Sequence, residues 1–308
     1  MAEGEQPERT TGIGMVQIGA TTDDGGTRGI SYRIGGEENL PFIGLECGGG
    51  HIPLVALEIC DDPASWPAVV AEYVGDAVHD PASWAGKAER EYGADLVRLY
   101  LTSTVKRDFA DFTTIGETIG KVLSGTSIPL AVEGVNDPSI DSEVFARVGE
   151  AGEGERLLLG TAEAGRYRSI AAAALAYNHS VIAQSPIDVN LAKQLNILLR
   201  EIGVKADQIL IDPYTGALGY GFEYSFSVME RIRYAALKGD ADLAMPMISS
   251  AIDSLNVREV READDATRGD MAVAWEFYAA FSSAVAGAAI VCVRHPRTVG
   301  MLHQAFHA

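Results

Sequence analysis

One complete unit of the fold is written in Ile209-Leu-Ile-Asp-Pro-Tyr-Thr-Gly-Ala-Leu-Gly-Tyr-Gly-Phe-Glu-Tyr-Ser-Phe226. Its first three residues are an apolar run that is typical of a buried strand. From Phe222 onward, apolar residues recur every three or four positions, at Phe226, Met229, Ile232 and Ala236. That period predicts a helix packed by one face. A glycine-rich and tyrosine-rich loop therefore joins a strand to a helix.

The same alternation of strand and helix extends over most of the chain. Short apolar runs lie at residues 53–57, 96–101, 128–132, 157–159, 181–183, 209–211, 243–248 and 289–293, and a helical pattern follows each. Eight units with fully apolar strands are typical of a parallel (β/α)8 TIM barrel of the α/β class. A doubly wound open sheet remains the alternative, because a sequence does not show closure.

The segments outside this rhythm define the predicted domain boundaries. Residues 1–14 are predicted as a disordered tail, and residues 15–308 as a single TIM-barrel domain. Two alternating segments, 15–20 and 30–34, flank a glycine-rich turn and predict an N-terminal β-hairpin extension. The polar stretch 249–269 predicts a long loop after the seventh strand. Ser185 and Pro186 predict a helix start, with Ser185 as N-cap and Asp188 in the first turn.

The charge of the chain excludes several classes of partner. The 308 residues carry a formal net charge of −19, which repels phosphate backbones and anionic membranes. No apolar run reaches the roughly 20 residues of a membrane span, and the polar start does not read as a signal peptide. We therefore expect a cytoplasmic protein with neither nucleic acid nor membrane as a partner.

Residues that bind metals or carry out catalysis form no recognisable pattern. Cys47, Cys60 and Cys292 are too few and too scattered for a four-thiolate cluster, so we expect no iron–sulfur cluster and no metal site on this chain. A phosphate-binding loop, a zinc-protease motif and a nucleophile elbow are all missing. Polar residues do follow the strands, among them Glu58, Glu133, Asn136, Thr161, Asp212, Ser249 and His295, but they assemble no catalytic group. We predict no catalytic residue.

The loop 212–224 is instead predicted to contact a protein partner or a large planar ligand. Its glycines allow close approach of the backbone, and its tyrosines offer flat apolar faces with a polar end. The residues expected to face this ligand or partner are Thr215, Gly216, Gly219, Tyr220, Gly221, Glu223, Tyr224, Ser185 and Asn190. Three alternatives stay open. Ser185 could serve only as a cap, Asn190 could face solvent or another subunit, and Tyr224 could pack within its own barrel.

Several segments together resemble one family. They are Gly19-Ala-Thr with Gly25-Gly-Thr-Arg28, Ser185-Pro-x-Asp-x-Asn with Lys193-Gln-Leu-Asn-Ile-Leu198, the stretch from Asp212 to Arg233, Met245-Pro246 and Arg294-His-Pro296. The chain resembles the small subunit of the corrinoid iron–sulfur protein, whose archaeal counterpart is the delta subunit of the acetyl-CoA decarbonylase/synthase complex. The resemblance runs from about residue 15 to residue 300.

This resemblance implies a partner, a cofactor and a role. It implies a heterodimer with a large subunit that bears the iron–sulfur cluster, with a corrinoid (cobalamin) held between the two barrels. The pair would carry a methyl group from methyltetrahydrofolate or another pterin to acetyl-CoA synthase, in the anaerobic carbon fixation of the reductive acetyl-CoA (Wood–Ljungdahl) pathway. Contacts with the methyltransferase and the synthase would be transient, and the chain would catalyse nothing alone.

Two departures and two competing functions accompany the resemblance. The family pattern implies an asparagine where Thr161 stands and an aromatic residue near Asp253. One competitor is a stand-alone methyltetrahydrofolate–corrinoid methyltransferase of the pterin-binding barrel class, with Asp212, Asn190 or Asn136 binding the pterin. The other is a purely structural partner that only stabilises its large subunit.

Overall fold

The computed structural model of the protein describes residues 12–40, 52–106 and 109–307. The predicted tail lies outside the described residues as far as residue 11, and so does Cys47. Within the described part, Ile13 is already buried in the core. Backbone bonds hold the chain there, since the Ile13 amide donates to the Glu37 carbonyl and the Gly14 amide to the Ala244 carbonyl.

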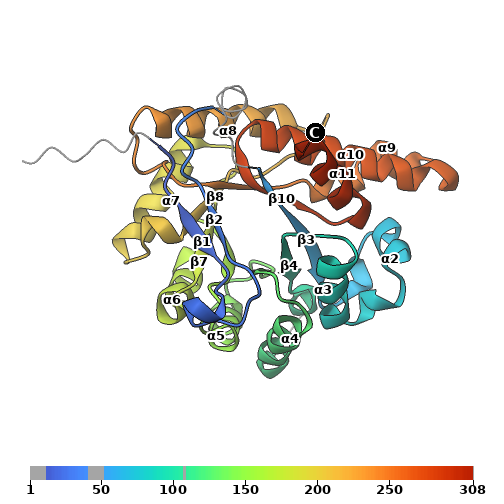
Figure 1. The fold of residues 1–308 in the computed structure, drawn as a ribbon, viewed down its shortest axis with the longest axis horizontal. Helices are drawn as coiled ribbons and strands as arrows, with labels where there is room; N and C mark the ends of the chain where they lie inside the picture. The colour runs from blue at the N-terminus through green and yellow to red at the C-terminus, as the bar shows by residue number, and fades with distance from the viewer. Residues whose placement is uncertain (1–11, 41–51, 107–108, 308) are drawn as a thin grey trace, which may run out of the picture.

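Eight parallel strands close into a barrel in chain order (Figure 1). They are β3 (Leu54–Cys60), β4 (Leu96–Tyr100), β5 (Leu130–Glu133), β6 (Leu158–Ala162), β7 (Ser180–Gln184), β8 (Ile209–Asp212), β9 (Met247–Ser250) and β10 (Ala288–Val293). The barrel closes where β10 pairs with β3, with Ile290 opposite Leu54. The TIM barrel is confirmed, and the open sheet is excluded.

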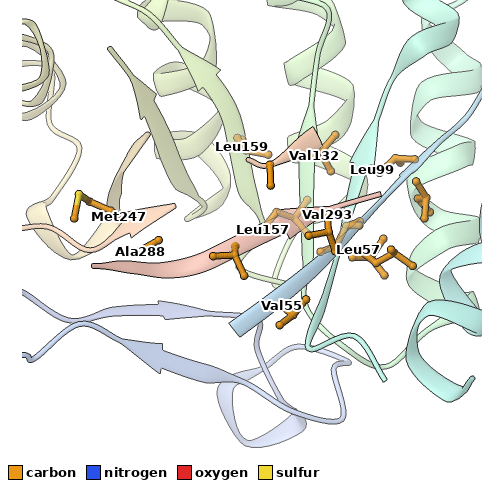
Figure 2. Close-up of a cluster of buried hydrophobic side chains, with 14 of the residues drawn as sticks. Val55, Leu57, Leu99, Val132, Leu157, Leu159, Met247, Ala288 and Val293 are labelled. Carbon is orange, nitrogen blue, oxygen red and sulfur yellow. The ribbon is translucent and has the colours of Figure 1, made fainter. Parts of the chain in front are cut away.

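Helices surround the strands, as Figure 1 shows. The α-helices are α2 (Ala68–Val74), α3 (Pro81–Arg90), α4 (Phe112–Gly125), α5 (Asp141–Ala151), α6 (Tyr167–Tyr177), α7 (Val189–Glu201), α8 (Phe222–Leu237), α9 (Arg258–Glu262), α10 (Asp265–Val285) and α11 (Pro296–Phe306). Their apolar faces bury the outward side chains of the strands. Figure 2 shows part of this layer, including Leu57, Leu99 and Val293.

The predicted N-terminal hairpin is confirmed and covers one end of the barrel. Its strands β1 (Val16–Ile18) and β2 (Tyr32–Ile34) pair antiparallel, with Val16 opposite Ile34. Val16, Ile18 and Ile34 are buried in one cluster with inward residues of the barrel strands, such as Leu96, Leu158 and Leu210. The hairpin therefore completes the apolar interior of the barrel at its amino-terminal end.

A buried arginine fastens the turn of the hairpin to the barrel. Arg28 is 4% exposed, and its Nε lies 2.7 Å from the carboxylate of Glu155. Its two terminal nitrogens donate to the carbonyls of Thr126 and Leu123 at 2.6 and 2.8 Å. All three nitrogens of the guanidinium group therefore have a hydrogen-bond acceptor, which offsets the cost of burying its charge.

The prediction of a long loop at 249–269 was wrong. This stretch contains a 3-10 helix (Ile252–Asn256), the helix α9 and the first turn of α10. Leu255, Val257 and Val260 are buried, while the charged residues that suggested a loop mostly face solvent. The side chain of Asp264 accepts from the amide of Thr267 at 2.9 Å and caps α10.

The predicted start of α7 was also misplaced. Asp188 is the N-cap, since its carboxylate accepts from the amides of Asn190 and Leu191 at 2.7 and 3.1 Å. Ser185 instead prolongs strand β7, because its amide donates to the Asp212 carbonyl at 2.9 Å. The chain then turns at Ile187, which has a positive φ of 53°. A helix cannot begin before such a residue.

Candidate functional site at the carboxyl end of the barrel

The interior of the barrel changes from apolar to polar along the strands. Ala56, Leu96, Ala131, Ile182, Leu210 and Ile248 belong to the inner apolar cluster. Side chains two positions further along a strand lie on the same face. Those positions are occupied by Glu58, Arg98, Glu133, Gln184, Asp212 and Ser250. A layer of polar groups therefore lies inside the carboxyl end of the barrel, which we call the mouth.

Arg98 of β4 is the centre of this polar layer. Its guanidinium is 2.9 Å from the carboxylate of Glu58, contacts that of Glu133, and donates to the Ser250 hydroxyl at 2.7 Å. Ser250 belongs to β9, so the arginine spans the interior of the barrel. Burial opposes the charge on Arg98, but the interactions with Glu58, Cys292 and Asp212 together outweigh burial and raise the arginine pKa. The side chain stays cationic.

A second arginine extends the network towards the rim. Arg294, which follows β10, contacts the Glu58 carboxylate through two nitrogens, each at 2.7 Å. Its guanidinium also lies 4.2 Å from the centre of a Trp66 ring, in cation–π geometry. Glu58 therefore accepts from two arginines at once. The two cations and two carboxylates neutralise each other within the mouth.

A buried glutamate of α10 stabilises the turn that carries Arg294 by accepting hydrogen bonds from its backbone amides. The Glu276 carboxylate accepts from the amides of Arg294 and His295 at 2.7 and 3.1 Å and from the Thr298 hydroxyl at 2.6 Å. Burial raises the pKa of Glu276 to about 7. Burial lowers the pKa of the adjacent His295 to about 4, and its Nδ1 accepts from the Arg297 amide as the cap of α11.

Asp212 lies beside this network at the end of β8. It is 4% exposed, and burial raises the pKa of its carboxyl despite the hydrogen bond from Gln184 at 2.9 Å. The carboxylate also accepts from the Tyr214 amide at 2.8 Å, which fixes the first turn of the loop. Asp212 therefore both fixes the start of the loop and contributes to the polar interior of the barrel.

Two buried oxygens, the hydroxyl of Ser185 and the side-chain oxygen of Asn136, are among the polar atoms of the mouth that have no hydrogen-bond partner in the described residues. The amide nitrogen of Asn136 is used, since it donates to the Thr161 hydroxyl at 3.2 Å. Buried polar groups are nearly always satisfied in folded proteins. The mouth therefore offers these two oxygens to a group that enters it.

The glycines of the loop 212–224 are required by the conformation of the loop itself. Gly219 and Gly221 have positive φ values of 73° and 107°. A Cβ on Gly216 would lie 3.1 Å from the backbone of Gly221, so the loop folds back on itself there. These three positions need glycine whether or not a partner approaches.

The tyrosines of the loop, in contrast, are exposed to solvent. Tyr214, Tyr220 and Tyr224 are 41%, 52% and 63% exposed. Tyr220 donates to the Glu259 carboxylate at 3.0 Å, whereas the hydroxyl of Tyr224 has no hydrogen bond to the described residues. Tyr224 therefore does not pack within its own barrel. Three exposed aromatic side chains thus lie within eleven residues of the chain, and we call them together the tyrosine face (Tyr214, Tyr220 and Tyr224).

The predicted site residues divide between the mouth, the loop and the solvent. Thr215 and Ser185 are buried at the mouth, where the Thr215 hydroxyl lies 2.7 Å from that of Ser249. Tyr220, Glu223 and Tyr224 are exposed on the loop and the first turn of α8, and Asn190 is exposed on α7. The structure thus separates an inner polar group from an outer aromatic group.

Sequence reasoning missed the residues that organise the mouth. Arg98, Gln184 and Ser250 were not singled out, and Arg294 was named only within a segment that resembles the family. A signal was available for Arg98, because an arginine in the middle of the apolar run 96–101 must be buried and paired if that run is an interior strand. No local pattern shows that Arg294, which is 236 residues from Glu58, would reach it.

Comparison with known proteins assigns the family. A model of the CO dehydrogenase/acetyl-CoA synthase delta subunit matches residues 15–286. The chain belongs to this family. The family predicted from the sequence is therefore confirmed.

Named relatives agree over nearly the whole chain. Acetyl-CoA decarbonylase/synthase complex subunit delta 1 of Methanosarcina thermophila is 35% identical over 310 residues, covering 96% of this chain and 70% of that protein. Subunit delta of Methanopyrus kandleri is 36% identical over 301 residues, covering 95% and 74%. These relatives are named as subunits of a complex, so the alternative of a stand-alone methyltransferase is not favoured.

Solved structures support the fold. Dihydropteroate synthase of Coxiella burnetii, in complex with pteroic acid, matches with a TM-score of 0.59 and 14% identity, over 95% of this chain and 98% of that one. Dihydropteroate synthase of Xanthomonas albilineans matches with a TM-score of 0.56 and 21% identity, over 85% and 97%. At this identity the likeness concerns the barrel alone.

Two further findings concern the described part of the chain. Its cysteines, Cys60 and Cys292, are free and buried, and burial raises the pKa of each thiol to about 12. None of its helices has the length and apolar character that crossing a membrane requires.

Proposed function

We propose that this chain is the small subunit of a heterodimeric corrinoid iron–sulfur methyl carrier. The pair carries a methyl group from methyltetrahydrofolate or a related pterin to acetyl-CoA synthase, in the reductive acetyl-CoA pathway. The observation that carries the proposal is the match to the delta-subunit family over residues 15–286. The arrangement of the mouth and the tyrosine face supports it.

The mouth suits the edge of a corrinoid. The corrin ring carries carboxamide side chains, each with donors and acceptors of hydrogen bonds. The unpartnered Ser185 hydroxyl and Asn136 oxygen can accept from such amides. A corrinoid bound here would supply the cobalt that accepts and releases the methyl group, while this chain would bind and orient the periphery of the macrocycle.

The tyrosine face suits a protein partner or the flat side of the macrocycle. Tyrosine buries a large apolar ring while its hydroxyl keeps a polar contact, and such residues are enriched at interfaces. One barrel end offers a single wall, whereas a ligand of this size needs to be enclosed on several sides. The large subunit, which bears the iron–sulfur cluster, would supply the opposite wall. Glu223 and Asn190 would lie at the edge of this contact.

The catalytic demands on this chain are small. Arg98, Arg294, Glu58 and Glu133 neutralise each other, and the described residues of the mouth combine no nucleophile with a base. We therefore assign it the binding and shielding of the methyl carrier, with transient contacts to the methyltransferase and to acetyl-CoA synthase. Conversion of a methyl donor would need the other subunits.

Purification from the native organism tests the proposal. A tagged chain should retain a partner that contains an iron–sulfur cluster, with one corrinoid per heterodimer in the visible spectrum. Identification of that partner by mass spectrometry completes the assignment. A chain that purifies without corrinoid and transfers methyl groups by itself would overturn the proposal.

Variants of the tyrosine face test the contact. Tyr220→Ala and Tyr224→Ala should weaken the heterodimer or its retention of corrinoid by at least about tenfold, as is typical of aromatic residues central to an interface. Tyr234→Ala is the matched control, since Tyr234 is 56% exposed on the same helix, ten residues beyond Tyr224. If all three variants pair and retain corrinoid equally well, the tyrosine face is not the contact.

A further inference from the structure

A second pocket lies at the opposite end of the barrel from the mouth. Its volume is about 350 Å³. It is lined by the hairpin and by the segments that lead into β6, β7 and β8, with contributions from Gln17, Arg33, Arg156, Asn178, Ser180, Lys205, Asp207 and Gln208. We call it the basal pocket. Its volume falls in the range of small-molecule sites.

The charge of the basal pocket opposes that of the whole protein. Three of its lining residues, Arg33, Arg156 and Lys205, are cationic, and only Asp207 is anionic. The chain as a whole carries −19. None of the three cations forms an ion pair with another described residue, whereas Arg28 in the same hairpin is fully paired. Cations outnumber carboxylates in the lining of the pocket, so an anion bound between them would relieve their mutual repulsion.

A serine hydroxyl adds to the polar wall of the basal pocket. Ser180, the first residue of β7, lines the basal pocket but is only 4% exposed. Its amide donates to the Leu157 carbonyl, which fixes its position. Beside it, Gln208 bonds Asn178 at 3.1 Å, so the polar wall is already oriented.

The walls of the basal pocket are fixed relative to each other. The Gly19 amide donates to the Arg156 carbonyl at 3.1 Å, which ties the end of β1 to the segment before β6. Arg33 lies on β2, opposite Gln17 of β1. Arg33 thus comes from the hairpin, and Arg156 and Lys205 come from the barrel. A ligand held by all three would bridge the two.

We propose that the basal pocket binds a small phosphorylated metabolite. Two guanidinium groups and an ammonium group match a phosphate with two negative charges, because arginine presents paired donors to oxyanions. The volume exceeds what a single phosphate ion fills. Asp207 and the side-chain amides would receive the hydroxyl or amino groups of the rest of the molecule. This site is separate from the mouth and does not depend on the corrinoid role of the chain.

Calorimetric titration of the full chain tests the proposal. The probes are ribose 5-phosphate and ATP, with inorganic phosphate, sulfate and citrate as simple anions. We expect one site that binds a phosphorylated probe at least about tenfold more tightly than sulfate. Arg33→Gln and Arg156→Gln should each weaken this binding by about tenfold or more, the usual size of a lost charged hydrogen bond. Ser180→Ala should weaken it less.

A matched control and an independent readout complete the test. Arg261→Gln removes an exposed arginine of α9 that forms no ion pair with a described residue, and it should leave binding unchanged. The bound probe should also slow hydrogen exchange in Val16–Ile18 and Tyr32–Ile34, because it links the hairpin to the barrel. Thermal melting of each variant without a probe shows whether it is folded.

Three outcomes would overturn the proposal. They are no binding of any probe, equal binding of phosphorylated probes and sulfate, which would indicate an adventitious ion only, and binding that the folded Arg33 and Arg156 variants leave intact. Failure here would leave the corrinoid role untouched, because that role is tested through the other end of the barrel.

Discussion

The barrel interior is filled by side chains of opposite character at its two ends, apolar at the amino end and charged at the carboxyl end. At the amino end, Val16, Ile18 and Ile34 of the hairpin complete an apolar interior. At the carboxyl end, Glu58, Arg98 and Glu133 fill the interior with charges, beside polar atoms that no described residue satisfies. The hairpin thus covers the amino end, whereas polar atoms at the carboxyl end have no partner among the described residues. In barrels of this class, function is found at the carboxyl end.

The largest expected effect comes from breaking the charged layer. Arg98→Met should lower the free energy of unfolding by about 3–5 kcal/mol, because Glu58 and Glu133 would remain buried without their shared partner. Arg147→Met is the matched control. Arg147 also contacts two glutamates, Glu143 and Glu150, but its side chain is 46% exposed, so the loss should stay within about 1 kcal/mol. Urea unfolding of both variants measures the difference, and equal losses would refute the contrast.

The second expected effect is a change of stability with pH, caused by Glu276 and by His295, the residue after Arg294. Glu276 has its pKa raised from 4.5 to about 7, so its contribution to stability is lost as the pH rises through that window. His295 has its pKa lowered from 6.5 to about 4, so its contribution is lost as the pH falls through nearly the same window. Each amounts to about 3 kcal/mol, and the two offset each other.

Replacing one of these two residues at a time should show how the other changes the free energy of unfolding with pH. Between about pH 4.5 and 6.5, Glu276→Gln should make stability rise with pH, because only the His295 contribution remains. His295→Asn keeps a capping side chain and should make stability fall with rising pH. Urea unfolding at several pH values measures both. Variants that share the slope of the unmodified chain would contradict the pairing.

A smaller loss of stability is expected when a buried side chain is shortened at the apolar, amino end of the barrel. Ile18→Val removes one methylene from a side chain that is 1% exposed in the inner cluster, and it should cost about 1 kcal/mol. Ile30→Val, in the same hairpin but 39% exposed, should change stability by less than about 0.5 kcal/mol. If Ile18→Val costs nothing in global unfolding, the hairpin is not part of the cooperative core.

The smallest effect is expected at the tyrosine face. Tyr224→Ser should leave the stability of the isolated chain within about 0.5 kcal/mol, since Tyr224 is 63% exposed. Thermal melting of the chain alone measures this. A loss above about 1 kcal/mol would show that the ring supports its own barrel.

The fold could be predicted because its signals are local. Eight apolar runs, each followed by a helical period, predicted the strands to within a few residues, and glycines between alternating segments predicted the hairpin. The greatest shift occurred at the seventh strand, predicted from residue 243 but observed as Met247–Ser250. Pro246 lacks an amide donor, and the ladder begins only after it.

The site was less predictable because its contacts are long-range. Glu58 and Asp212 follow apolar runs and could be named from the sequence, but their environment depends on Arg98, Arg294 and Gln184 from other strands. The glycines of the loop suggested close approach of a partner, whereas their positive φ values and the fold of the loop explain them equally well. A sequence shows which residue types are present, and only closure of the barrel shows which of them meet.

The closure between β10 and β3 also constrains how the chain folds. Ile290 pairs with Leu54, and Arg294 reaches Glu58, so the first and last barrel strands meet only after the whole sequence is available. Contacts of such sequence separation form slowly, since a long loop must close before they stabilise anything. During synthesis, Glu58 therefore has no contact with Arg294 until Arg294 has emerged from the ribosome. Until β10 is in place, β3 and β9 have unpaired edges that can pair with other chains. The contacts of the mouth are therefore among the last to form as each new chain folds.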